Sequence, residues 1–162
     1  MSTLIANTLQ GINTIKYDAN TTAMTIDNNG IVSNGTHVFA RASSANQATA
    51  GNDVLLNTGQ ETSGGCTFQD TNTSIQVPVA GLYLIGFHTL GNSGSGNLQM
   101  HIRKNGTALP GTHIQETGSA NDVGSATTIA QLAANDKITF HVGSGTTHQN
   151  SSFNNHYVVK IG

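Results

Sequence analysis

The stretch that decides the fold reads Gly81-Leu-Tyr-Leu-Ile-Gly-Phe-His-Thr-Leu90 and is apolar at most of its positions. In a strand, successive side chains point to opposite faces. Two apolar sets therefore arise, one of Leu82, Leu84 and Leu90 and the other of Tyr83, Ile85 and Phe87. One set can fill the core of a sandwich, and the other needs a neighbouring subunit or a covering loop.

Short strand patterns separated by turn residues surround this stretch. Lys104-Asn105-Gly106-Thr107 predicts a hairpin, because Asn-Gly suits the two positive-φ positions of a type I′ turn. Further strands are predicted at 38–42, 54–57, 98–102, 125–132 and 138–142, and a loop at 58–65. The last strand is expected to turn one face inward, with Phe153, Asn155, Tyr157, Val159 and Ile161. Many short strands without a helical stretch predict an all-β fold, an antiparallel β-sandwich or jelly roll.

Composition excludes several classes of protein. The chain has 162 residues, a net charge of -2 and only 9% charged residues, so neutral polar side chains must keep it soluble. Six Lys and Arg residues cannot form a basic stripe, which argues against nucleic-acid binding. The single cysteine, Cys66, excludes an intrachain disulfide framework and is expected to be a buried thiol. No apolar run approaches the roughly 20 residues of a membrane span, so membrane insertion is not expected.

The first 36 residues differ from the rest of the chain. Their apolar residues are sparse, and so short a segment cannot bury a core by itself. We expect residues 1–36 to be an irregular N-terminal arm for docking and assembly, followed by a head at 37–162. The docking residues expected in the arm are Leu9, Ile12, Ile15, Met24 and Ile26.

Four segments of the head, 38–42, 76–85, 101–106 and 153–161, together resemble the C1q/TNF-like jelly-roll domain. The second is the most distinctive, with Pro78-Val79-Ala80-Gly81-Leu82-Tyr83-Leu84-Ile85 similar to that domain's Pro-x-x-Gly-x-Tyr-x-Phe run. Ile85 replaces the commoner Phe, and Asn155 stands where the closing strand often has Gly. The resemblance implies a homotrimer with the central and closing strands near the threefold axis. The residues expected in the core or the trimer interface are Tyr83, Ile85, Phe87, Phe140 and Tyr157.

The arm carries a second resemblance. Residues 7–12 and 23–30 resemble segments of structural proteins from tailed phages, especially those of marine cyanobacterial hosts. This implies a virion protein, assembled in the bacterial cytoplasm, whose arm docks on other virion proteins. The main hypothesis is a non-enzymatic, trimeric short fibre, appendage or fibre-tip subunit. The alternatives are a capsid decoration or cement protein, and a secreted C1q-like binding protein.

Polar loops are the expected contact with a host glycan or protein. Seven of the eight aromatic residues fall in strand-like runs and the eighth, Tyr17, lies in the arm, so none is left for an obvious sugar-binding platform. The candidate receptor residues are Asn92, Ser93, Ser95, Asn121, Asp122, Thr146, His148 and Gln149.

No catalytic residue and no cofactor is predicted, apart from calcium as an open possibility. The chain has no nucleophile elbow and no helical metal-binding motif among its seven histidines. His101 and His141 are expected on an outward face, and three copies of one histidine on a threefold axis could bind a metal or an anion. Some C1q-like trimers bind calcium, for which the candidates are Asp53, Asp70, Asp122 and Asp136; the alternative is that these residues only form turns.

Overall fold

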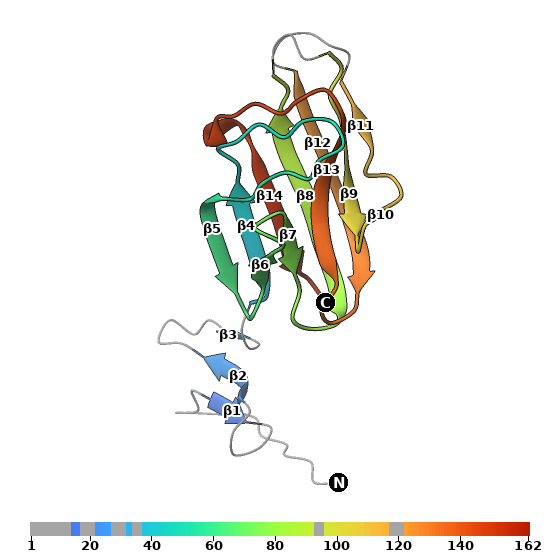
Figure 1. Cartoon of the computed structure of the whole chain (residues 1–162). Coiled ribbons are helices and arrows are strands. Elements are labelled where there is room, and N and C mark those ends of the chain that lie inside the picture. The colour runs from blue at the N-terminus through green and yellow to red at the C-terminus, as the bar shows by residue number, and fades with distance from the viewer. Residues whose placement is uncertain (1–13, 17–21, 27–31, 34–36, 93–95, 117–121) are drawn as a thin grey trace. The chain divides into compact units, whose positions relative to one another are not determined.

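The computed structural model describes residues 14–16, 22–26, 32–33, 37–92, 96–116 and 122–162. The chain divides into two units, Met1–His37 and Val38–Gly162. In the first unit, β1 (Thr14–Lys16), β2 (Thr22–Ile26) and β3 (Val32–Ser33) form an antiparallel sheet (Figure 1). Of the predicted docking residues, Ile15 pairs with Met24 and Ile26 with Val32, whereas Leu9 and Ile12 lie outside the described residues.

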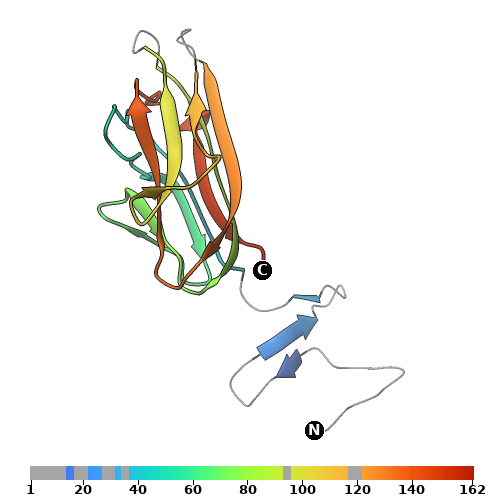
Figure 2. The same cartoon turned by 90° about the vertical axis from the view of Figure 1, so that its right-hand side faces the viewer.

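The second unit is an antiparallel sandwich of two sheets, seen from two sides in Figures 1 and 2. The sheet that we call sheet I has the strand order β12-β8-β14-β4-β5. Its strands are β4 (Phe39–Ser43), β5 (Thr58–Ser63), β8 (Gly81–Leu90), β12 (Val123–Leu132) and β14 (Asn155–Lys160). Within the described residues the only helical element is a short 3-10 turn, η1 (Ser151–Phe153). The all-β prediction is confirmed.

The opposing sheet, sheet II, has the order β10-β9-β13-β7-β6, with β11 also paired to β9. Its strands are β6 (Thr67–Gln69), β7 (Ser74–Gln76), β9 (Gln99–Lys104), β10 (Thr107–Ala108), β11 (Ile114–Gln115) and β13 (Lys137–Ser144). The predicted hairpin joins β9 to β10, where Asn105 and Gly106 have φ values of 49° and 81°. Both values are positive, as a type I′ turn requires.

The core lies between the sheets and takes one face of the central strand. Tyr83, Ile85 and Phe87 of β8 are 0–1% exposed. Phe87 meets Phe140 of β13 edge to face, with ring centroids 6.0 Å apart. The buried Tyr83 hydroxyl donates to the carbonyl of Val79 at 2.8 Å, so its polar group is satisfied. The other face of the strand, with Leu82, Leu84 and Leu90, points away from this core.

The expected orientation of the last strand is wrong. In β14 the buried residues are His156 and Val158, while Tyr157 and Val159 are on the opposite face. Phe153 and Ile161 are 45% and 50% exposed. The pairing of β14 with β8 sets this orientation, because Val158 lies opposite Ile85 and must share its inward face.

Two predictions around residue 57 are also wrong. Residues 54–57 form no strand, although Val54 and Leu56 are fully buried where this segment crosses the sandwich. The polar segment after it, expected as a loop, contains the edge strand β5. That strand pairs with β4, and Arg41 donates to both carboxylate oxygens of Glu61 at 2.9 and 2.7 Å.

Candidate functional site

The sandwich has two different ends. The chain enters sheet I at Phe39, which pairs with Val159, and the C-terminal segment lies beside this entry because Lys160 N donates to Val38 O at 2.8 Å. His88, near the end of β8, pairs with Asn155 at the start of β14. The loops that follow β8 therefore lie at the end of the sandwich remote from the chain entry, as Figure 1 shows. We call this remote end the loop end.

Four predicted receptor residues are brought together at the loop end. Asn92 N donates to Thr146 O at 2.9 Å, and His148 N donates to Leu90 O at 2.7 Å. Asp122 joins the same group, because its carbonyl accepts the N–H of Gly91 at 2.8 Å. Gln149 is next to His148 and exposed, while Ser93, Ser95 and Asn121 lie outside the described residues.

A buried asparagine ties a further loop to this end. Asn154 is 5% exposed; its Oδ1 accepts the N–H of Ser44 at 2.6 Å, and its Nδ2 donates to Ser44 O at 2.9 Å. Ala48 and Thr147 exchange two hydrogen bonds of 2.9 Å, one of them through the threonine hydroxyl. Segments from three parts of the chain thus form one hydrogen-bonded surface whose backbone is held in place.

The outer face of sheet I carries apolar side chains that the single chain leaves uncovered. Leu84 lies between Ile129 of β12 and Val159 of β14, and Val159 in turn pairs with Phe39 of β4. We call these four residues the outer row. Ile129 is 57% exposed, and the other three are half-buried. Leu82, Val123 and Ile161 add exposed apolar surface at 39%, 52% and 50%.

Of the five residues predicted in the core or the trimer interface, four are buried in the core and one lies on the outer face of sheet I. Tyr83, Ile85, Phe87 and Phe140 are buried within one chain, so they belong to its core. Tyr157 alone lies on the outer face. Of the outer row, Ile129, Val159 and Phe39 were not predicted at an interface, and the signal that could have found them is the second apolar set of the central strand, which includes Leu84.

Tyr157 lies across Gly86 on this outer face. Its hydroxyl is 3.0 Å from Oγ1 of Thr127, and a Cβ placed on Gly86 would overlap that hydroxyl. A glycine in mid-strand normally weakens a sheet, and here it leaves room for the tyrosine ring. The outer face is therefore shaped by a close contact, as well as by apolar side chains.

We expect Gly86→Ala to fold with a free energy of unfolding lowered by about 1–2 kcal/mol, because the tyrosine must leave its place. Tyr157→Ala removes both overlapping atoms, the hydroxyl oxygen and Cζ, so the double variant should recover much of the loss caused by Gly86→Ala. Urea denaturation of the wild type, both single variants and the double variant gives the coupling energy. Strictly additive losses would contradict the contact.

Histidines form a row on the outer face of sheet II. His101 of β9 pairs with His141 of β13, with ring centroids 5.1 Å apart, and His113 stacks on His101 at 5.2 Å. His141 Nδ1 lies 2.8 Å from Oδ1 of Asp53, and Arg103 Nε donates to His101 Nε2 at 3.0 Å. His101 and His141 thus lie on the outward face, as expected, and neighbouring residues of the same chain leave each of them only 8% exposed.

These contacts keep His101 neutral. Burial lowers its pKa first, and the nearby charges of Arg103, His141 and His113 lower it further, against a smaller opposing effect of Asp53. Because its Nε2 accepts from Arg103, the ring proton of the neutral form is on Nδ1. Protonation would remove the acceptor that Arg103 uses and place a second positive charge beside it, so this contact requires the neutral ring.

We expect the protein to lose stability on mild acidification, chiefly through His156. This residue is fully buried beside Phe87 and Phe140, and burial lowers its pKa to about 4. The unfolded chain, with a pKa near 6.5, takes up this proton first, so stability is complete above pH 6.5 and falls as the pH approaches 4. The expected loss from His156 between pH 7 and 5 is about 2 kcal/mol, with a further contribution from His101.

Urea denaturation of the full chain at pH 7 and pH 5, at one protein concentration, measures this loss. The H156L variant keeps the volume and removes the titrating group, so its pH dependence should shrink by about the same 2 kcal/mol. The pKa of paired carboxylates such as Asp70 is lowered in the folded chain. Their stabilising effect is therefore lost only below about pH 4 and does not change between pH 7 and 5. An unchanged pH dependence in H156L would contradict the assignment.

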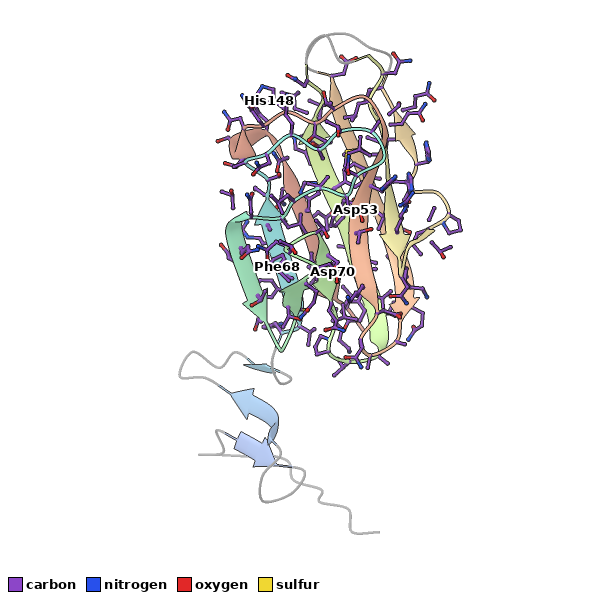
Figure 3. The ribbon with its side chains drawn as sticks, in the orientation of Figure 1. Asp53, Phe68, Asp70 and His148 are labelled. Atoms are coloured by element: carbon purple, nitrogen blue, oxygen red, sulfur yellow. The ribbon has the colours of Figure 1, made fainter. Side chains whose placement is uncertain are left out.

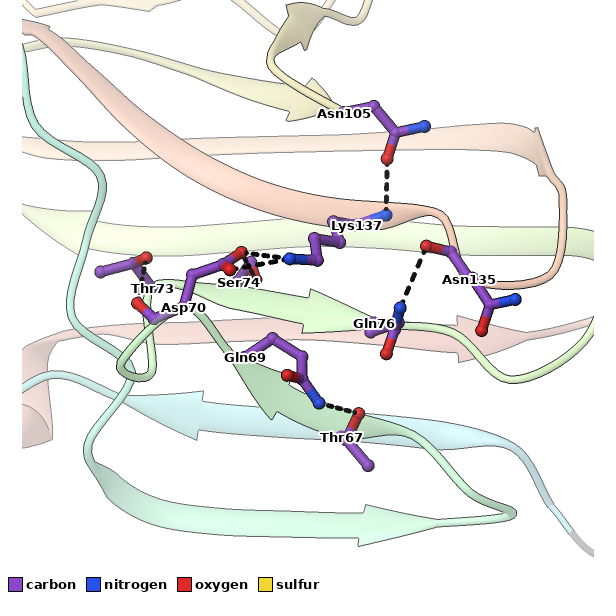
Figure 4. A network of polar contacts seen from close by, with 9 residues as sticks. All are labelled: Thr67, Gln69, Asp70, Thr73, Ser74, Gln76, Asn105, Asn135 and Lys137. Carbon is purple, nitrogen blue, oxygen red and sulfur yellow. Dashed lines mark hydrogen bonds and ion pairs between the residues drawn. The ribbon is translucent and has the colours of Figure 1, made fainter.

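Three of the four aspartates considered as calcium ligands, Asp53, Asp70 and Asp136, each contact different residues of the chain. Asp70 is bound by Lys137 Nζ at 2.7 and 2.9 Å and by Ser74 Oγ at 2.7 Å, in the network of Figure 4. Asp53 is paired with His141, and Figure 3 shows it away from the loop end marked by His148. Asp136 accepts Asn105 Nδ2 at 2.7 Å and Ala133 N at 2.8 Å.

Lys137 and Ser74 lower the pKa of Asp70, so its carboxylate is already neutralised by a protein cation. In the described part of the chain, no three histidine, cysteine or carboxylate side chains are arranged to hold a metal ion. Within the described residues of one chain, Asp53, Asp70 and Asp136 are therefore not gathered into one site, and calcium binding stays a prediction. Burial also raises the pKa of Cys66 to about 11, which keeps its thiol protonated and unreactive. No helix among the described residues is long and apolar enough to cross a membrane.

Comparison with known proteins places the fold. No family model and no curated protein matches the chain. Among solved structures, the TNF protein Eiger from S. frugiperda aligns with a TM-score of 0.60 at 11% identity, covering 79% of this chain and 94% of that one. Murine APRIL at pH 8.5 aligns with a TM-score of 0.61 at 13% identity, covering 77% and 99%. Murine APRIL at pH 5.0 gives 0.60 at 13%, with the same coverage. At these identities the likeness is one of fold, and the head is a TNF-like jelly roll.

Proposed function

We propose that this chain is a non-enzymatic structural protein of a tailed-phage virion. In this proposal three copies associate through the outer face of sheet I, the N-terminal arm docks on another virion protein, and the loop end contacts the host surface. The observation that supports it most is that the two ends of the head differ. The arm joins one end of the sandwich, the polar loops gather at the other, and an uncovered apolar face runs between them.

The outer face supports the homotrimer. A monomer leaves the outer row in water, whereas association removes it at a gain of about 25 cal/mol per Å² of apolar surface. The resemblance to C1q/TNF-like domains implies that this same face surrounds a threefold axis. Tyr157, over Gly86, adds an amphipathic ring, which suits a subunit interface.

The arm and the loop end support the role in a virion. Residues 7–12 and 23–30 resemble segments of tailed-phage structural proteins, and the arm leaves the head at the end remote from the loops. A threefold head offers three copies of each loop site, so weak individual contacts add up to a useful avidity. This arrangement suits a short fibre or fibre tip that binds a surface.

Light scattering from the purified chain at dilute concentration tests the assembly. The expected mass is about three times 16.8 kDa, independent of concentration. Gold-labelled antibody against the loop end then locates the protein on particles, and labelling at the tail is expected. A monomer would contradict the trimer. Labelling across the head lattice would replace the fibre with a capsid decoration protein.

A further inference from the structure

An aromatic pair is displayed at the loop end. Phe153 is the one aromatic residue among the exposed large apolar side chains of the described chain. Its ring meets that of His148 edge-on, with centroids 5.2 Å apart and an interplanar angle of 80°. Figure 3 places His148 at this end of the sandwich, beside η1. Phe153 belongs to η1, just before β14, and its 45% exposure leaves the ring outside the core and available for binding.

The turn that carries Phe153 is held firmly. Asn150 caps η1, and its Oδ1 accepts the N–H of Ser152 at 2.9 Å. The buried Asn154 closes the turn from the other side by donating to Asn150 O at 3.1 Å. A preorganised ring loses little conformational freedom when a ligand packs on it.

Hydrogen-bonding groups surround the ring. His148 Nδ1 accepts the N–H of Asn150 at 3.0 Å, which leaves Nε2 of the neutral ring as a donor. Gln149 and Ser152 are exposed, and their side chains make no hydrogen bond within the described residues. Their amide and hydroxyl groups can each donate and accept.

The segments that form the site contain no charged residue, and the charged residue of the loop end, Asp122, bonds to the neighbouring Gly91 through its backbone carbonyl. Residues 142–159 contain no Asp, Glu, Lys or Arg, and neither do residues 42–52, which are hydrogen-bonded to them. Such a site disfavours ions, which would exchange full hydration for uncharged groups. It favours a neutral ligand that has one apolar face and a rim of hydroxyls.

We propose that Phe153 and His148 form a binding site for a neutral sugar unit of a surface glycan. The C–H face of a pyranose packs on the Phe153 ring, and its hydroxyls bond to Gln149, Ser152 and His148 Nε2. The apolar contact supplies affinity, and the uncharged donors and acceptors orient the sugar. This proposal rests on the proposed role of the loop end in host contact, and names the ligand class for it.

Nuclear magnetic resonance of the full chain tests the site, with maltotriose, chitotriose and lactose at millimolar concentration as probes. At least one probe should give saturable shifts at Phe153 and His148. Phe153→Ser should weaken that binding about tenfold or more, the loss of a central aromatic contact. The matched control is Val79→Ser, which removes a side chain of similar exposure (43% against 45%) just before β8, at the opposite end of the sandwich.

Gln149→Ala is a second variant that leaves the aromatic pair in place, so it tests the site even if Phe153→Ser fails to fold. It should weaken binding without changing the spectrum of the free protein. The proposal is overturned if no probe gives saturable shifts, if the shifts lie elsewhere, or if both variants bind as the wild type does.

Adsorption of the labelled trimer to a panel of bacterial cells separates this proposal from the broader function. If the wild type adsorbs and Phe153→Ser does so equally, the sugar site is overturned and host contact stands, with a protein receptor as the replacement. If Phe153→Ser loses adsorption while Val79→Ser keeps it, the site is supported. If the wild type binds a sugar probe but adsorbs to no cell, the site stands and the host-contact function fails.

Discussion

Phe87→Asp is expected to leave no folded protein at room temperature. Phe87 is 1% exposed, faces Phe140 and His156, and has no cationic partner among its ring contacts. A carboxylate there would be buried without a counter-charge, or would have to take up a proton, and the core would also lose an aromatic ring. The combined cost exceeds about 5 kcal/mol, which is comparable to the whole stability of a domain.

His88→Asp is the matched control, because it places the same charge at the next position of the same strand. His88 is exposed on the outer face, so this variant should keep the wild-type fold. Circular dichroism of both variants gives the answer, because a charge on the outer face acts on the proposed trimer and leaves the fold of the chain in place. A folded Phe87→Asp protein with native spectra would mean that the inward face of β8 has been assigned wrongly.

Ile129→Asp is expected to leave the chain folded and to turn the proposed trimer into a monomer at micromolar concentration. Ile129 is 57% exposed in the single chain, so aspartate there stays in water and costs the monomer little. In the trimer the same residue would bring an unpaired charge from each subunit into an apolar contact. Loss of a central apolar contact alone costs an interface about 2 kcal/mol or more, and the buried charge adds to this.

Light scattering across a dilution series measures this effect, and circular dichroism checks the fold. Val79→Asp is the control, because Val79 is an exposed apolar residue outside sheet I, and its variant should remain trimeric. If Ile129→Asp and the wild type have the same trimeric mass, the subunits do not meet through the outer row. If neither variant is trimeric, the effect comes from added charge, and the assignment fails as well.

The two predictions depend on which apolar set of β8 faces the core, and the residues of that strand could not decide this. Both sets are rich in leucine, isoleucine or aromatic residues, so alternation alone shows only that each face needs a partner. Pairing decides it. Ile85 lies opposite Val158 and Leu84 opposite Val159, and only one of these pairs can point into the sandwich.

The same ambiguity explains the error in the last strand. Phe153, Tyr157, Val159 and Ile161 form a regular apolar alternation, which is typical of a core face. In the tertiary structure they point outward, and His156 with Val158 takes the inward positions. An apolar face that the chain leaves uncovered has the same local pattern as a face that fills the chain's own core.

Some features of the fold have no local pattern in the sequence and come from packing between distant segments. The edge strand β5 is polar, so no alternation marks it, and its pairing comes from β4 and the contact of Arg41 with Glu61. The row of His101, His141 and His113 comes from separate segments that meet only across sheet II.

The sequence by itself determined the all-β class, the central strand, the Asn105-Gly106 hairpin and the likeness to C1q/TNF-like domains. These follow from local alternation and turn chemistry, which act within a few residues of the chain. Only the tertiary structure decided which faces are buried, which loops share an end, and which aromatic residue remains exposed. Those outcomes depend on contacts between segments far apart in the chain, because in a sandwich strand with two apolar faces the pairing register groups the residues by face and the contact with the opposing sheet selects the buried face.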